Sequence, residues 1–296
     1  GDAFNSKGSI IHLNGQLMTM GFPVNIIWWE ANYLENGHLP NPNTEAWLGD
    51  PIGGTSSTIT FSNTAYPDSP VQFNNEYEAG KFHAMNSHLV MQAGPGNRIE
   101  TKHIVGIHDY WKITMAAGTL VKGNVLDKLT FTSLGNIDSY GDFNEVEFFE
   151  NGRMRGSHSY NTLTIRGSYF YHILDGGGGN TQTINAGGTL NVLNADCAHL
   201  AYLYTDGPTT TAKIAKTGGA LHLQHVILDN VLPDLTTGAT YSATNSFGIQ
   251  PQVTADWNMT NPTPRNLYWV GGSGIWHDSN HWSLASGGAG GECPPT

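Results

Sequence analysis

Four segments of the chain share one apolar–polar–apolar pattern: Lys112-Ile-Thr-Met115, Lys128-Leu-Thr-Phe131, Glu145-Val-Glu-Phe148 and Thr162-Leu-Thr-Ile165. Their apolar pairs begin at positions 113, 129, 146 and 163, so the interval between successive pairs is nearly constant. Alternate residues on a strand point to the same face. A strand that recurs at this interval, between turns rich in Gly, Asn, Asp and Ser, is typical of a solenoid. The pattern predicts an all-β fold, a right-handed parallel β-helix with irregular coil lengths. The alternative is a β-sandwich or jelly-roll in which the spacing is coincidental.

Stacking explains why such a repeat would fold, because one coil cannot bury its own apolar face but two neighbouring coils can. We expect two inward columns of side chains. The first holds Ile113, Leu129, Val146 and Leu163, and the second holds Met115, Phe131, Phe148 and Ile165. The same register places Lys128 beside Glu145, an opposite-charge pair that contributes roughly 0.2–1 kcal/mol and mainly sets the register.

Composition excludes several classes of protein. Only 12% of the 296 residues are charged, 37 are Gly, and the formal net charge is −11 with 13 Lys and Arg. A chain with so few cations has no basic stripe to replace phosphate counterions, so we expect no nucleic-acid partner. No apolar run approaches the roughly 18–20 residues of a membrane span, so we expect no membrane insertion. The sequence shows no signal peptide and no initiator Met, and we expect Gly1 to begin a mature or excised segment.

The two cysteines, Cys197 and Cys293, are compatible with one disulfide, with bonds to other chains or with free thiols. Two cysteines at that separation do not make a zinc site, and no other metal motif is present. We expect no metal and no cofactor.

The last segment of the chain differs from the rest. Tyr268-Trp-Val-Gly-Gly-Ser-Gly-Ile-Trp276-His-Asp-Ser-Asn-His281-Trp282 combines three tryptophans with glycines, and Gly287-Gly-Ala-Gly-Gly291 and Cys293-Pro-Pro-Thr296 follow it. We therefore divide the chain into a solenoid domain, 1–262, and a Trp/Gly-rich connecting segment, 263–296.

This segment resembles a motif in very large, repetitive surface proteins of Bacteroidetes bacteria, among them gliding-motility and adhesin-like proteins of the type IX secretion route. In that family the motif precedes a Gly-rich stretch and Pro-Thr, and a new β-strand repeat then opens with Asp and Phe. Here Pro-Thr stands at 295–296, and the matching opening, Asp2-Ala-Phe4, lies at the other end of the chain. The resemblance covers roughly residues 1–15 and 158–296. It implies one repeat of a tandem array, or one subunit of a head-to-tail polymer, in which residues 268–296 contact the N-terminal part of another copy.

The contact residues that we expect from this reading are Tyr268, Trp269, Trp276, Trp282 and Cys293, since aromatic anchors dominate interfaces. The family often places a second cysteine near the strand at 220–228, and this chain has none there. This departure from the family pattern puts a family disulfide at Cys197 in doubt, and the states given above for the two cysteines stay open.

Catalytic residues are harder to find. The best cluster is Glu100-Thr-Lys-His103 with His108, Asp109 and Lys112, since a polysaccharide lyase needs a base and a charge-neutralising cation along one groove. An odd number of positions separates His103 from His108, so on one extended strand they would face opposite sides. We expect no catalytic residues; a lyase or hydrolase is the runner-up.

Sugar binding is the remaining alternative. Exposed tryptophans on one face could stack on sugar rings, but they cluster near the two ends of the chain, where burial at coil ends or subunit contacts explains them. Arg153 and Arg155 could bind an acidic sugar, yet Asp138 lies one coil before Arg155 in the expected register and predicts a cross-coil ion pair instead. The sequence thus favours a structural or adhesive unit of an extracellular bacterial surface filament, with further copies of itself and a surface polysaccharide as partners.

Overall fold

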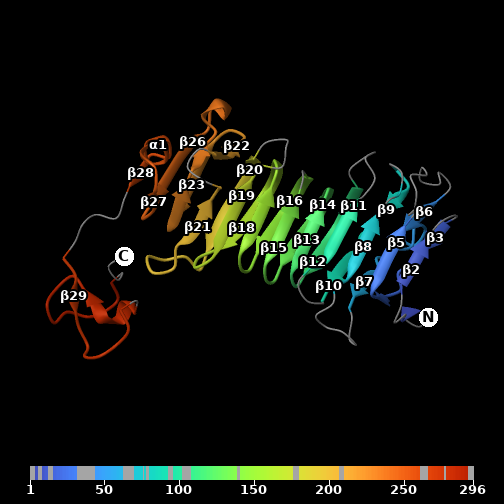
Figure 1. The fold of residues 1–296 in the computed structure, drawn as a ribbon, viewed down its shortest axis with the longest axis horizontal. Helices are drawn as coiled ribbons and strands as arrows, with labels where there is room; N and C mark the ends of the chain where they lie inside the picture. The colour runs from blue at the N-terminus through green and yellow to red at the C-terminus, as the bar shows by residue number, and fades with distance from the viewer. Residues whose placement is uncertain are drawn as a thin grey trace.

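The computed structural model describes residues 4–5, 9–12, 16–31, 44–62, 70–75, 77, 80–92, 96–101, 108–138, 141–175, 180–206, 210–260, 266–276 and 278–292. The strands stack side by side along one long axis, from the N-terminal coils at one end to the C-terminal coils at the other (Figure 1). All strand pairs of this stack are parallel, which is the arrangement of a β-solenoid and not of a sandwich. The predicted fold class is confirmed.

Sheet A has 11 strands and holds the repeat from which the fold was predicted. In spatial order they are β1 (Phe4–Asn5), β4 (Val24–Ile26), β7 (Thr58–Phe61), β10 (His88–Met91), β12 (His108–Met115), β14 (Gly123–Phe131), β16 (Gly141–Phe148), β18 (His158–Arg166), β20 (Thr181–Leu193), β22 (Ala212–Lys216) and β25 (Val231–Pro233). Strands β12, β14 and β18 each contain a register irregularity near their middle, which lets one strand turn a corner of the coil.

Sheet B also has 11 strands and forms a second face. They are β2 (Ser9–His12), β5 (Trp28–Ala31), β8 (Gln72–Asn75), β11 (Arg98–Thr101), β13 (Gly118–Val121), β15 (Gly135–Asp138), β17 (Gly152–Arg155), β19 (Phe170–Leu174), β21 (Ala201–Tyr204), β24 (Val226–Asp229) and β27 (Phe247–Gly248). Two three-stranded sheets complete the ends. The N-terminal one holds β3 (Gln16–Met18), β6 (Glu45–Trp47) and β9 (Phe82–His83), and the C-terminal one holds β23 (Ala220–Gln224), β26 (Thr240–Thr244) and β28 (Met259–Thr260).

The interior is built from columns of side chains that repeat once per coil. The register pairs Ile113 with Leu129, Leu129 with Val146 and Val146 with Leu163, and it pairs Met115 with Phe131 and Phe131 with Phe148. All eight residues of the two expected columns are buried. Coil length varies along the first column. Val24 pairs directly with Ile59 across β4 and β7, so the coil between them is more than twice as long as the one between Ile113 and Leu129.

The C-terminal end of the stack is covered by a short helix, α1 (Pro251–Asp256), which packs against β25, β27 and β28. Val253 of this helix is buried, and so is Trp257, which follows it. The Trp257 indole Nε1 donates a hydrogen bond to the carbonyl of Val231, 2.9 Å away, and its ring meets Tyr241 edge-on at 5.5 Å. A short 3-10 helix, η1 (Leu235–Thr237), lies beside the same coils. These contacts cap the apolar end that an open solenoid would expose.

Beyond this cap lies a small separate module (Figure 1). Strands β29 (Tyr268–Trp269) and β30 (Trp282–Ser283) pair antiparallel, and a 3-10 helix, η2 (Ser279–His281), leads into β30. We call residues 266–292 the tail module. The division at 262–263 expected from the sequence falls between β28, the last strand stacked on the solenoid, and β29.

Two adjacent tryptophans near the N-terminus, Trp28 and Trp29, lie in β5 of the second coil. Trp29 is completely buried in the interior, where its ring tilts against Phe73 at 5.5 Å. It belongs to the continuous core and is covered by neighbouring coils.

Candidate functional site

The cluster with the most catalytic character in the sequence, residues 100–112, is divided between two sheets. Glu100 lies in β11 of sheet B and forms a 2.9 Å ion pair with the arginine two positions earlier. His108 is buried at the start of β12, while Lys112 of the same strand precedes the buried Ile113 and therefore points outward. His103 lies outside the described residues. The described members of this cluster do not converge on one groove.

Metal ligation finds no support in the described part of the chain. No group of three or more His, Cys, Asp or Glu side chains there is placed to hold a metal ion. No helix among the same residues is long and apolar enough to span a membrane.

The outer face of sheet A carries a network of ion pairs. Lys128 Nζ lies 2.7 Å from Glu145 Oε1, as its register predicts, and also 2.7 Å from Glu147 Oε2. Arg166 Nη2 lies 2.5 Å from the other oxygen of Glu147, and its guanidinium stands 4.0 Å above the Phe149 ring. Burial, the largest single effect, opposes ionisation of Glu147, but the hydrogen bonds from Lys128 and Arg166 outweigh it and lower the pKa of this carboxyl. Each charge of this network is paired with another charge of the same network.

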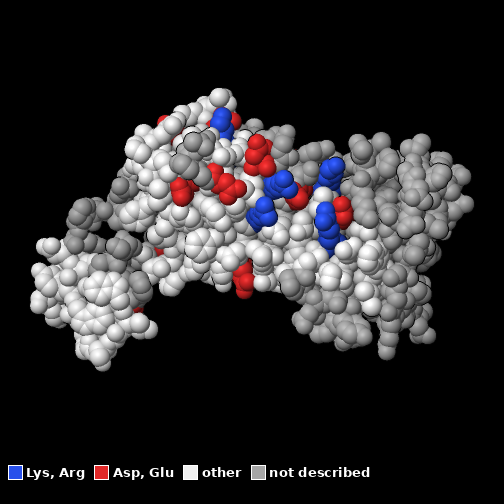
Figure 2. Space-filling model, viewed as in Figure 1, with Lys and Arg blue, Asp and Glu red and all other residues white. Residues whose placement is uncertain are grey.

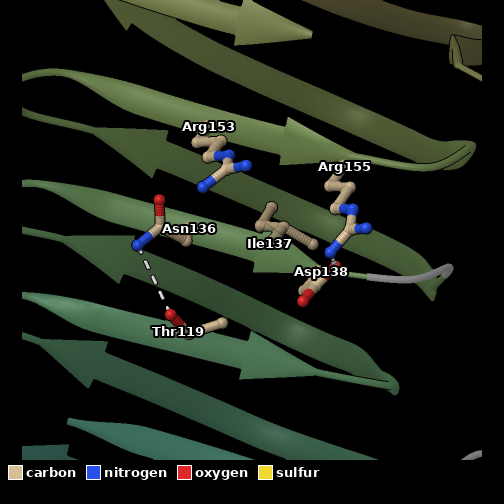
Figure 3. Close-up of a pocket in the computed structure, with 6 residues that line it drawn as sticks. All are labelled: Thr119, Asn136, Ile137, Asp138, Arg153 and Arg155. Atoms are coloured by element: carbon tan, nitrogen blue, oxygen red, sulfur yellow. Dashed lines mark hydrogen bonds and ion pairs between the residues drawn. The ribbon is translucent and has the colours of Figure 1, made fainter. Parts of the chain in front are cut away.

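The outer face of sheet B is different, because it contains a hollow. Figure 3 shows its lining: Thr119 comes from β13, Asn136 and Asp138 from β15, and Arg153 and Arg155 from β17. The hollow measures about 300 Å³, open solvent included. The Asn136 amide donates a 3.3 Å hydrogen bond to the hydroxyl of Thr119, which links β15 to β13 in this lining.

The two arginines of the hollow are in unlike environments. Arg155 Nη1 lies 3.7 Å from Asp138 Oδ1 and the two residues are register partners, so the predicted cross-coil ion pair is confirmed. Among the described residues Arg153 has no ion-pair partner, and its side chain is exposed. A single unpaired guanidinium therefore stands at the hollow.

Four rings follow the hollow along the same face, and we call Phe170, His172, Tyr202 and Tyr204 the aromatic cluster. The rings of His172 and Tyr204 stack face to face, with centroids 4.3 Å apart and planes within 6°. Phe170 meets Tyr202 edge-on at 5.4 Å, and Tyr202 lies 5.5 Å from Tyr204. Phe170 is 54% exposed, so its ring adds accessible apolar area to this face.

One acidic side chain is hydrogen-bonded to a ring of the cluster, and a second lies beside another ring. The Tyr202 hydroxyl donates a 2.8 Å hydrogen bond to Asp229 Oδ2, and the Gln250 amide donates to the other oxygen of that carboxylate at 3.2 Å. Burial first, and then the hydrogen bond and charge of Asp229, raise the pKa of Tyr202 to about 12. His172 Nε2 lies 2.8 Å from Asp206 Oδ1.

The hollow and the aromatic cluster form one continuous row. Arg153 is the register partner of His172, His172 of Tyr204, and Tyr204 of Asp229, on strands β17, β19, β21 and β24. In Figure 2 the basic and acidic side chains gather in a band along the stack, while much of the remaining visible surface is uncharged. This row of cation, rings and carboxylate is the strongest candidate binding surface on the solenoid.

The tail module carries a second aromatic surface. The Trp269 ring stacks on His281 at 4.7 Å and within 4°, and it lies 6.5 Å from Trp276. Trp282 is only 5% exposed, because it packs between Trp269 and Trp276 and donates from Nε1 to the Trp276 carbonyl at 2.8 Å. Trp276 remains 53% exposed and the neighbouring Ile275 75%. Trp282 is therefore the core of the module, and Tyr268, Trp269, Ile275 and Trp276 form its accessible apolar surface.

Of the two cysteines, Cys197 lies in the described part of the chain. Cys197, in the segment after β20, is disulfide-bonded, which is one of the states that the sequence left open. No described cysteine is free. Cys293, expected at the contact between copies, lies outside the described residues.

The aromatic cluster was missed in the sequence. Tyr202 and Tyr204 alternate with buried residues in Ala201-Tyr-Leu-Tyr204, a period-two signal that predicts one outward face. The sequence did not reveal that these tyrosines share a row with Arg153 and His172, because the coils after Ile165 have unequal lengths. No family model, no curated protein and no solved structure matches the chain.

Proposed function

We propose that this protein is a non-catalytic structural and adhesive unit of an extracellular bacterial surface fibre, whose copies assemble head to tail. One observation carries the proposal: the two ends of the solenoid are unlike. Strands β1, β2 and β3 are edges of their sheets, and among the described residues nothing pairs with their outer sides. The opposite end is closed by α1 and Trp257 and is followed by the tail module.

Unlike ends favour a contact that propagates. An unpaired strand edge is a template for pairing with another chain, and the tail module offers an exposed apolar surface to a partner. When the surface at one end fits the surface at the other, the contact is heterologous, and copies add into a fibre instead of closing as a dimer. The motif order in the sequence, in which the tail leads into the opening of a new repeat, supports the same direction of assembly.

Catalysis, the competing function, has less support. Glu100, His108 and Lys112 lie on different faces. The charged groups around Glu147 on the outer face of sheet A are engaged with one another. A polysaccharide-cleaving enzyme requires an acid or base and a cation that converge on one sugar ring. The described residues do not provide that arrangement. The aromatic cluster on sheet B provides groups that are suited to binding a ligand but not to cleaving it.

Negative-stain electron micrographs of the purified chain, beside a variant that lacks residues 266–296, test the proposal. The deletion removes the tail module and leaves α1 and Trp257 to cap the solenoid. We expect end-to-end fibres from the parent and single short rods from the variant. Rods alone from the parent across a wide concentration range, or fibres of equal length from both proteins, would contradict head-to-tail assembly through the tail.

A further inference from the structure

We propose that the outer face of sheet B, from the hollow at Arg153 to the aromatic cluster, binds an acidic polysaccharide, a polymer of sugar rings that carry carboxylates. The inference gives a ligand class to the adhesive part of the proposed function and rests on it to that extent. The binding surface itself lies within one chain and needs no assembly.

The first argument concerns ring faces. Tyr204 covers one face of the His172 imidazole, since the two planes lie within 6° at 4.3 Å. The other face of His172 is turned toward the preceding coil, where its register partner is Arg153 and not another ring. The stack of rings thus ends at β19, with His172 as its last ring. A sugar ring has an apolar C–H face that packs on such an aromatic surface, and Phe170 exposes more apolar area beside it.

The second argument concerns charge. Arg153 is exposed and has no ion-pair partner among the described residues, whereas Arg155 beside it is engaged with Asp138. A guanidinium binds a carboxylate through two parallel hydrogen bonds, which makes arginine well suited to recognise a sugar acid. The chain carries 24 Asp and Glu against 13 Lys and Arg, so most of its surface repels an anionic polymer. An unpaired arginine such as Arg153 offsets this repulsion locally and gives an anionic polymer a point of attachment.

The third argument concerns length. The row runs from Asn136 on β15 through Arg153, His172 and Tyr204 to Asp229 on β24. Four strand-to-strand steps of about 4.8 Å span roughly 19 Å along the solenoid axis. At one end of this row the Asn136 amide can donate a hydrogen bond to a sugar hydroxyl, and at the other end the Asp229 carboxylate can accept one. A surface this long and this straight suits several linked sugars and not a single one.

Isothermal titration calorimetry with polygalacturonate tests the proposal, with a neutral dextran of similar length as the comparison. Arg153→Gln removes the unpaired cation, and its matched control is Arg98→Gln, an arginine of the same face that is already paired with Glu100. His172→Ala removes the last ring of the stack. Its control is His222→Ala, at an exposed histidine on β23.

We expect the parent to bind polygalacturonate more weakly as salt rises, and dextran at least tenfold more weakly than polygalacturonate. Arg153→Gln and His172→Ala should each lose at least tenfold in affinity, while the two controls stay within about twofold. Circular dichroism melts verify that all variants are folded. Absence of binding, equal affinity for dextran, or equal losses in Arg153→Gln and Arg98→Gln would overturn the inference. Because micrographs test assembly separately, fibres without polysaccharide binding would refute this site alone.

Discussion

Gly135 lies directly against the ring of Phe131, so closely that a methyl group at position 135 would overlap the ring. Gly135 is also the register partner of Gly118 and Gly152, one coil away on either side. A Cβ at Gly152 would meet Phe148 at 2.9 Å in the same way. A column of glycines thus leaves room for the ring stack of Phe131 and Phe148, whose centroids are 5.0 Å apart and whose planes lie within 10°.

Gly135→Ala should therefore destabilise the solenoid, because the added methyl group forces the Phe131 ring out of its stack. We expect a loss of about 1–3 kcal/mol in the free energy of unfolding, measured by urea denaturation. Phe131→Ala removes Cγ and Cδ1, the two ring atoms that would lie closest to the added carbon, so the double variant should lose clearly less than the sum of the two single losses. Additive losses would show that the close approach carries no strain.

Phe148→Asp tests the inward column that the regular spacing of the four segments predicts. The ring is completely buried, so the substitution places a charge among apolar side chains, and we expect a loss of at least about 4 kcal/mol or a failure to fold. Leu126→Asp is the matched control, since Leu126 is 48% exposed on β14 and its replacement leaves the core intact. A thermal melt of Phe148→Asp that coincides with that of Leu126→Asp would contradict the register.

The two inward columns of side chains could be predicted from the sequence, because apolar residues recur at nearly constant spacing at Ile113, Leu129, Val146 and Leu163. Gly118, Gly135 and Gly152 carried the same period, and their role became clear only when the Phe131 ring was in place. Periodicity fails where coils change length: Leu163 pairs with Leu190, a much longer step than those before it, and this change hides the row on sheet B. The burial of Trp282 was likewise unpredictable, because it depends on how one short antiparallel pair folds over it.

Because the His158 side chain is buried, we expect the protein to lose stability in acid. The side chain lies beside Phe143, and burial, the main cause, lowers its pKa to about 4, although the hydrogen bond to the Arg155 carbonyl and the nearby Asp142 act in the opposite direction. The unfolded chain binds a proton near pH 6.5 and the folded chain only near pH 4, so this histidine costs stability as pH falls from about 6.5 to 4. The cost approaches about 3 kcal/mol at the lower limit.

His158→Gln removes the titrating group. We expect its free energy of unfolding to fall less steeply than that of the parent between pH 6.5 and 4, in urea titrations at half-unit steps. His222→Gln, at an exposed position, should keep the parental slope. The prediction fails if His158→Gln and the parent have parallel pH profiles.

Two tryptophans of the tail module, Trp276 and Trp282, were both expected from the sequence at the contact between copies, but they lie in different environments. Trp282 is the core of the module, so Trp282→Ser should unfold it and abolish assembly indirectly. Trp276 is 53% exposed, and Trp276→Ser should leave the module folded while it removes the central part of the surface that a neighbouring copy would cover.

Analytical ultracentrifugation measures assembly, and the chemical shifts of the Trp269 and Trp282 indole N–H groups report whether the module is intact. We expect Trp276→Ser to weaken association at least tenfold while both resonances stay sharp and dispersed, each shifted only by the loss of the neighbouring Trp276 ring. Leu284→Ser, at an equally exposed position of the same module, is the control and should associate like the parent. If Trp276→Ser assembles as well as Leu284→Ser, the exposed face of the tail does not join copies.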